Sequence, residues 1–282
     1  KAVDMLVMTA TPIPRTLVLT HYGDMDVSKL DEKPVGRKPI ATAAISDNRI
    51  EQIIQRISEQ VQAGQKVYWI CPLVEDNEAL DLVSVEQRHK SLSERFGASV
   101  GLVHGQMKGP DKDKAMAEFK DGKTRILVAT TVVEVGVDVP DATIMVIENA
   151  ERFGLSQLHQ LRGRVGRGEN ASSCVLLYKE PLGEIARARL DIMRQTEDGF
   201  RIAEEDLRLR GEGEILGTRQ SGTVDFRLAR MEAHSHLLEI ARSEARYIIE
   251  TDPKLEGPRG AALRTLLYLF ERDAAIRLLG AG

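Results

Sequence analysis

Short apolar runs alternate along the first two thirds of the chain with segments whose apolar residues repeat at helical spacing. An apolar run of this kind is typical of a strand buried on both faces of a parallel sheet. Alternating strands and helices indicate an α/β domain with a parallel sheet flanked by helices. Strands are expected at 5–8, 67–71, 100–103, 126–129, 144–147 and 175–178, and helices at 48–62, 85–96, 112–120 and 157–163.

The pattern changes after residue 180. Residues 182–196 and 200–209 predict two helices joined at 197–199, which would form an antiparallel helical hairpin. Several glycines then interrupt residues 211–222 and predict an irregular loop. Two further amphipathic stretches, at 228–250 and 259–279, predict C-terminal helices that pack through their apolar positions.

Composition narrows the class of protein. The chain has 282 residues, 42% hydrophobic and 29% charged, which suits one large domain with an appendage. Aromatic residues make up 4%, so base stacking is not expected to dominate a nucleic-acid contact. Because the net charge is -4, any basic surface must be local, and residues 201–230 carry the arginines for one. No apolar run is long enough for a signal peptide or a membrane span, so the cytoplasm is expected.

Two cysteines, Cys71 at the end of one apolar run and Cys174 beside another, have no paired spacing. Buried reduced thiols are therefore favoured over a disulfide, and a zinc site is not expected.

Residues 157–168 carry the most informative chemistry. Arg164 and Arg167 stand three residues apart between glycines, and a helix would place both on one face. Arginine binds phosphate bidentately and always stays charged, so such a pair suits a triphosphate. A solvated basic helix end is the alternative.

A second candidate segment spans residues 125–140. Thr130 and Thr131 follow the apolar run 126–129, where open α/β sheets place their ligands. Gly136 and Pro140 then shape a loop that holds Asp138, whose carboxylate is placed to accept a hydrogen bond from a sugar hydroxyl. On this segment alone, Asp138 could equally be a helix cap or a turn former.

These two segments together resemble motifs V and VI of superfamily 2 helicases. Residues 8–16 resemble motif III, and residues 66–77 and 100–109 resemble motif IV and its neighbour, in the correct order. The resemblance implies a RecA-like fold of the P-loop NTPase type. It divides the chain into the tail of a first RecA-like domain (1–20), a second RecA-like domain (21–180), a helical hairpin and loop (181–230) and a C-terminal helical segment (231–282).

Three more segments, 22–27, 34–40 and 198–222, resemble the RecG family of bacterial fork-remodelling helicases. The last of them looks like the TRG motif, which the transcription-repair coupling factor Mfd shares in outline. Glu214 and the run 218–220 favour RecG over Mfd.

The resemblance implies a role for each candidate residue. Arg167 would be the arginine finger that reaches the γ-phosphate of ATP, assisted by Arg164 and by Gln160 of the same segment. Gly136 and Asp138 would bind the nucleotide. The residues implied in DNA binding or in coupling are Thr9, Thr11, Thr130, Thr131, Arg189, Arg210 and Gln220. Simple strand-end capping is the alternative for Thr9 and Thr11. Arg210 could instead cap a helix end, and Gln220 could satisfy carbonyls of its loop.

One expected motif was not found. Residues 122–124 end like a phosphate-binding loop, but they follow a helix and precede a strand, which is the wrong order. The resemblance therefore implies a C-terminal motor part. ATP with Mg²⁺ would be held mainly by the missing first domain, and the fragment would be inactive alone. Its expected partners are branched or forked DNA and, within the same protein, an N-terminal wedge and the first RecA-like domain. An Mfd-like translocase and a non-catalytic DNA-binding module are the alternatives.

Overall fold

The computed structural model describes residues 36–72, 78–130, 139–210 and 231–270, with the single residues 6, 8, 28, 30 and 32. Side chains at 78–83, 210, 231–233, 235–236 and 238–239 lie outside this description. The chain forms two compact units, and nearly all described residues of the first lie between residues 30 and 210. The second is described over residues 231–270.

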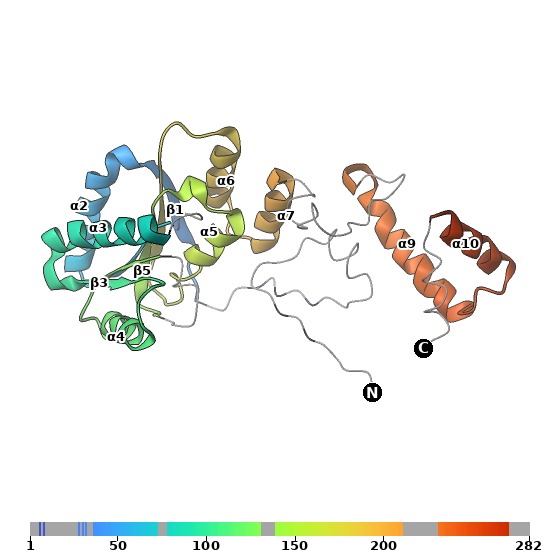
Figure 1. Cartoon of the computed structure of the whole chain (residues 1–282), viewed down its shortest axis with the longest axis horizontal. Helices are drawn as coiled ribbons and strands as arrows, with labels where there is room; N and C mark the ends of the chain where they lie inside the picture. The colour runs from blue at the N-terminus through green and yellow to red at the C-terminus, as the bar shows by residue number, and fades with distance from the viewer. Residues whose placement is uncertain are drawn as a thin grey trace. The chain divides into compact units, whose positions relative to one another are not determined.

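The first unit is built on a six-stranded sheet in which every described pairing is parallel (Figure 1). The strand order is β1-β6-β5-β2-β4-β3, so the strands cross over several times along the chain. This confirms the predicted α/β fold. The strands are β1 (Ile40–Ser46), β2 (Lys66–Ile70), β3 (Val100–Val103), β4 (Ile126–Ala129), β5 (Ala142–Ile147) and β6 (Ser172–Tyr178).

The edge strand β1 was missed by the sequence analysis. Its sequence, IATAAIS, is rich in small residues, and β6 is its one neighbour in the sheet. An edge strand buries less side-chain surface than a central one, so its apolar pattern is weaker. The strand predicted at 5–8 lies outside the described residues except for Leu6 and Met8.

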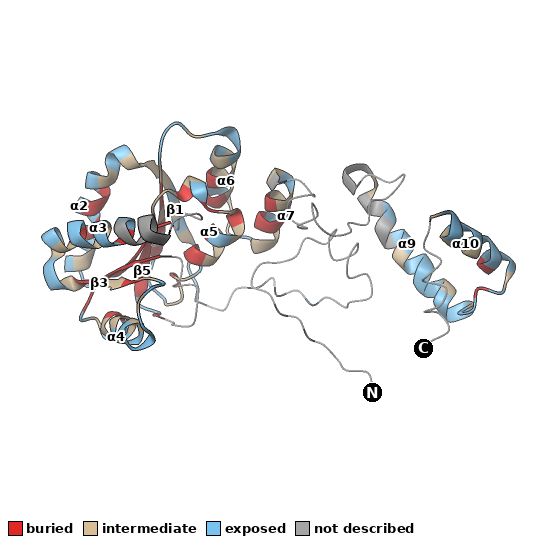
Figure 2. Ribbon diagram, in the orientation of Figure 1, coloured by how far each residue is buried: buried red, intermediate tan, exposed pale blue. Residues whose placement is uncertain are grey.

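Helices cover both faces of the sheet, as the alternation of side chains along a strand requires. Trp69 of β2 packs on one face with α2 and α3, whereas its neighbour Tyr68 packs on the other face with α4 and α5. The central strands β2, β4 and β5 are buried at every position, and the outer surfaces of the helices are exposed (Figure 2). The helices of this layer are α2 (Ile50–Gln62), α3 (Glu78–Phe96), α4 (Gly109–Lys120) and α5 (Leu155–Arg162).

Two helices follow the sheet, α6 (Glu184–Gln195) and α7 (Gly199–Arg210), as predicted. The side chain of Asp198 accepts hydrogen bonds from the backbone of Phe200 (2.8 Å) and Arg201 (3.4 Å), which caps the start of α7. Both helices add buried apolar side chains to the core on the α5 side of the sheet. They are therefore part of the domain's core rather than an appendage to it.

The second unit contains α9 (Met231–Thr251) and α10 (Pro258–Leu269). The Asp252 carboxylate accepts hydrogen bonds from the backbone of Glu256 and Gly257, both at 2.9 Å, and shapes the turn between the two helices. The break predicted there is confirmed. Helix α10 ends at Leu269, before the predicted end at 279, and residues beyond 270 lie outside the description.

Both cysteines are buried and free, as predicted. Burial raises the pKa of the Cys174 thiol to about 12, against an ordinary value of 9.0. Burial, reinforced by the nearby Glu148 carboxylate, also raises the pKa of Cys71.

The raised pKa of the Cys174 thiol predicts that the free energy of unfolding depends on pH. Above pH 9 the unfolded chain releases a proton that the folded chain keeps, so the free energy of unfolding falls as pH rises towards 12. The contribution is about 1.4 kcal/mol per pH unit. Denaturant unfolding of Cys174→Ala between about pH 9.5 and 11 should therefore show a shallower decline than the parent chain. Parallel declines would contradict this account.

Candidate functional site

Because the strands are parallel, their carboxyl ends share one edge of the sheet and their amino ends share the opposite edge. Thr130 follows β4 at the carboxyl edge, where the sequence analysis placed it. Its backbone N–H donates to the carbonyl of Val103 (3.2 Å). Its buried hydroxyl has no hydrogen-bond partner among the described residues, so it is available to a ligand or to a neighbour outside the described ranges.

The arginine loop, defined as residues 163–168, lies at the amino edge. Gly166 has φ +73°, and a Cβ there would stand 2.9 Å from Cγ1 of Ile40, the first residue of β1. A Cβ on Gly168 would stand 2.7 Å from the carbonyl oxygen of Pro140, just before β5. The two glycines therefore allow the loop to pack directly against the starts of two strands.

The two candidate arginines do not share a helical face. Helix α5 ends at Arg162, so Arg164 and Arg167 lie beyond it, in the arginine loop. Both are half-buried, and the Nε of Arg167 donates to the carbonyl of Gly163 (3.1 Å). Gln160 lies on α5 itself and is also half-buried. A backbone contact within the loop, rather than helical spacing, therefore orients Arg167.

Arg162 is a functional candidate that the sequence analysis missed. Its side chain is 2% exposed, and Nη1 donates to the carbonyls of Met193 (2.7 Å) and Thr196 (2.9 Å) at the end of α6. Its Nη2 lies 3.1 Å from Nδ1 of His159, which must be the acceptor because a guanidinium only donates. Burial lowers the pKa of Arg162. This arginine joins the end of α5 to the end of α6.

Helix α5 is also bonded to the second hairpin helix. The Ser156 hydroxyl donates to the buried Asp206 carboxylate of α7 (3.1 Å). Between α6 and α7, the Glu197 carboxylate accepts a hydrogen bond from the backbone N–H of Ile40 (2.5 Å). The helix that leads into the arginine loop is thus tied to both helices of the hairpin, and the hairpin turn is tied to β1.

The structure describes only some of the other predicted site residues. Arg189 is half-buried on α6, and its Nε has no hydrogen-bond partner among the described residues. Arg210 ends α7, but its side chain lies outside the description. The predicted residues that fall wholly outside the described ranges are Thr9, Thr11, Thr131, Gly136, Asp138 and Gln220.

Residues 122–124 form a turn between α4 and β4, with Gly122 at φ +78°. The sequence interpretation that they are not a phosphate-binding loop agrees with this order of elements. Over the ranges that the structure describes, no three or more histidine, cysteine or acidic side chains gather as a metal site. In the same ranges, no helix has the length and apolar character needed to cross a bilayer.

Two family models match the chain. One describes the helicase conserved C-terminal domain and matches residues 48–169. The other describes domain 3, C-terminal, of ATP-dependent DNA helicase RecG and matches residues 196–274. The second match includes α7 and the described helices α9 and α10 of the second unit.

Curated relatives and a solved structure agree with these models. The chain is 51% identical over 251 residues to ATP-dependent DNA helicase RecG of Acidithiobacillus ferridurans, covering 89% of this chain and 37% of the relative. It is 50% identical over 251 residues to the Escherichia coli K12 protein of the same name, covering 88% and 36%. A structure of RecG bound to a three-way DNA junction superposes with a TM-score of 0.66 at 44% identity, covering 85% of this chain and 31% of that one. The chain thus spans little more than a third of the curated relatives.

Proposed function

The chain belongs to the C-terminal helicase region of the RecG family, and on that basis we propose that it is the second half of an ATP-driven motor for branched DNA. The full motor would remodel stalled replication forks and recombination intermediates. The match of residues 196–274 to a RecG-specific model favours this over an Mfd-like translocase.

The arginine loop is the proposed contribution to ATP hydrolysis. Arg167 would reach the γ-phosphate, with Arg164 beside it, while Asp138 and Gly136 would contact the nucleotide. In support, Gly168 packs on Pro140, which brings the loop to the point where the 125–140 segment ends. A first RecA-like domain elsewhere in the full protein would supply the phosphate-binding loop and most ligands of Mg²⁺. We assign none of the described residues to the metal, whose chemistry is to neutralise charge on the phosphates.

DNA is proposed to lie along the carboxyl edge of the sheet. The buried hydroxyl of Thr130, which has no hydrogen-bond partner among the described residues, supports this, since DNA phosphates accept hydrogen bonds from threonine. The similarity to a RecG that binds a three-way DNA junction supports branched DNA as the substrate class. A bacterial motor of this kind would work in the cytoplasm, at the nucleoid.

The observation that carries the proposal is the bonding of α5 to the hairpin. Arg162 and Ser156 connect the arginine-loop helix to α6 and α7, so a shift of the loop during the ATP cycle would displace the hairpin. The hairpin leads directly into residues 211–222, the segment similar to the TRG motif. Arg189, Arg210 and Gln220 are the proposed carriers of that motion towards the duplex.

Arg210 at the end of α7 provides a test in the full-length protein. We expect Arg210→Ala to keep forked-DNA binding and most ATP turnover but to abolish fork unwinding, because it interrupts transmission rather than chemistry. Arg201→Ala, an exposed arginine on the same helix, is the matched control and should unwind forks normally. Unwinding of a labelled fork, with DNA affinity and ATP turnover measured in parallel, checks both variants. Loss of DNA binding by Arg210→Ala would contradict the transmission role.

A further inference from the structure

Glu148 follows β5 at the carboxyl edge of the sheet and connects two other elements there. Its backbone N–H donates to the carbonyl of Ile70 at the end of β2 (2.9 Å). Its Oε1 accepts a hydrogen bond from the indole N–H of the fully buried Trp69. The end of β5 is therefore bound to the end of β2 through both backbone and side chain.

The same carboxylate binds helix α3. The Nε of Arg88 donates to Glu148 Oε1 (2.5 Å), and Nη2 donates to Oε2 (3.1 Å), a two-point contact between planar groups. The guanidinium carbon also lies 5.6 Å from the centre of the Trp69 ring. The Glu148 and Arg88 side chains are 16% and 23% exposed, so this ion pair is shielded more than an ordinary surface pair.

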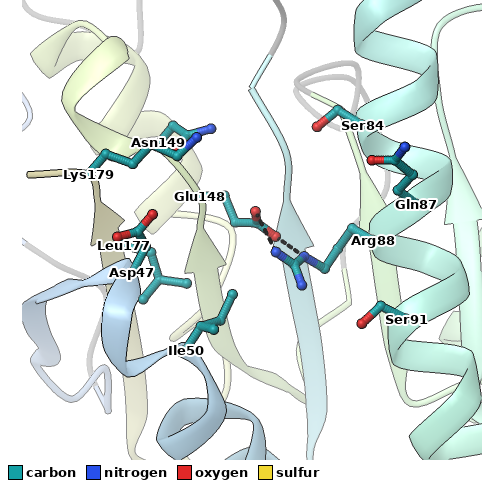
Figure 3. Close-up of a pocket in the computed structure, with 10 residues that line it drawn as sticks. All are labelled: Asp47, Ile50, Ser84, Gln87, Arg88, Ser91, Glu148, Asn149, Leu177 and Lys179. Carbon is teal, nitrogen blue, oxygen red and sulfur yellow. Dashed lines mark hydrogen bonds and ion pairs between the residues drawn. The ribbon is translucent and has the colours of Figure 1, made fainter.

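Figure 3 shows the pair at the wall of a hollow of about 430 Å³. Arg88 reaches across from α3, and Glu148 meets it from the sheet. The hollow separates this part of α3 from the start of α2 and the end of β6. The Arg88–Glu148 ion pair, together with the contact between Arg88 and Trp69, thus links α3 directly to the sheet at this hollow.

The position of Glu148 in the chain gives the contact its significance. Asn149, with φ +47°, and the short 3₁₀ helix η4 (Ala150–Arg152) come next, followed by α5 and the arginine loop. Helix α5 runs between its neighbouring strands from the carboxyl edge back to the amino edge. Glu148 therefore anchors, on the proposed DNA side, the segment whose far end carries Arg164 and Arg167.

We propose that Glu148 is a positioning residue that couples DNA at the carboxyl edge to ATP hydrolysis at the amino edge. DNA that presses on α3 moves Arg88. The shared carboxylate passes this displacement to η4 and α5, and so to the arginine loop. The inference rests on the proposed motor function and adds Glu148 to the residues that carry it.

The test compares ATP turnover by the full-length protein with and without forked DNA. Glu148→Gln keeps one acceptor oxygen for Trp69 but removes the charge that binds Arg88, and Arg88→Met removes the guanidinium. In each variant we expect DNA-stimulated kcat to fall about tenfold, while DNA-free turnover, the KM for ATP and DNA affinity stay within about twofold. The double variant should lose no more than the stronger single variant, because both remove one contact.

Arg95→Met is the matched control on the same helix. Its guanidinium lies 3.6 Å from Glu51 in an exposed pair, and its loss should leave DNA stimulation unchanged. Trp69 is the single tryptophan of the chain, so its fluorescence during thermal unfolding of the 282-residue chain shows that each variant is folded.

Two outcomes would overturn the inference. One is DNA stimulation within twofold of the parent in both Glu148→Gln and Arg88→Met. The other is an equal proportional loss of DNA-free and DNA-stimulated turnover, which is the mark of a merely structural role. If the parent full-length protein itself showed no DNA-stimulated turnover, the proposed motor function would fail. That result is distinguishable from both outcomes above, because they are measured against an active parent.

Discussion

Replacing Arg167 with alanine in the full-length protein is expected to lower DNA-stimulated ATP turnover by about 10³-fold or more, the range of an arginine finger. The guanidinium would neutralise charge that develops on the transferred phosphoryl group, and alanine offers no substitute. Binding of forked DNA should persist, because the arginine loop lies at the amino edge and DNA is proposed at the carboxyl edge. Steady-state turnover and fork affinity measured on the same preparation check both expectations.

Arg152→Ala is the matched control for that substitution. Arg152 is an exposed arginine of η4 in the segment that leads to α5, but it lies outside the arginine loop. Its loss should change turnover by less than about twofold, as surface substitutions usually do. Equal effects of the two substitutions, or near-parent turnover by Arg167→Ala, would argue against Arg167 as the finger.

Replacing Arg162 with methionine is expected to destabilise the first unit by about 3 kcal/mol, since each buried carbonyl left without a donor costs about 1–3 kcal/mol. Methionine fills similar space but donates nothing to Met193 and Thr196, whose carbonyls close the end of α6. Denaturant unfolding of the 282-residue chain measures the loss. Hydrogen exchange should show the amides of α6 and α7 losing more protection than those of the sheet.

The control substitution for Arg162→Met is at Arg194, which lies on α6. Arg194 is half-exposed and pairs with Asp191 at 3.2 Å, one turn away on the same helix. Arg194→Met should cost less than about 0.5 kcal/mol. If Arg162→Met cost no more than this, Arg162 would not be the link between α5 and the hairpin.

The fold was largely predictable because the central strands β2, β4 and β5 are fully buried and largely apolar. Five of the six strands and the helices between them follow from periodicity alone, whereas β1 does not, because its small residues give a weak pattern. Helix α3 begins at Glu78, before the predicted start at 85. Boundaries of this kind depend on neighbours that periodicity does not include.

The arrangement of the candidate site differs from the predicted one, and the roles of its residues stay predictions. The motif resemblance identified the arginines, yet their helical spacing was the wrong reason, since α5 ends before them. Arg162 looked like one more member of a basic cluster. Its burial depends on carbonyls more than thirty residues away, which local sequence does not reveal. Arg88 and Glu148 meet across sixty residues for the same reason.

The central claim is that these residues hold half of an ATP site, and ATP turnover by the 282-residue chain tests it most directly. The measurement is made with and without forked DNA, beside the full-length protein as a positive reference. The account predicts no turnover above background by the chain under either condition and DNA-stimulated turnover by the full protein. Robust DNA-stimulated turnover by the chain alone would contradict it, because a complete nucleotide site would then lie within these residues.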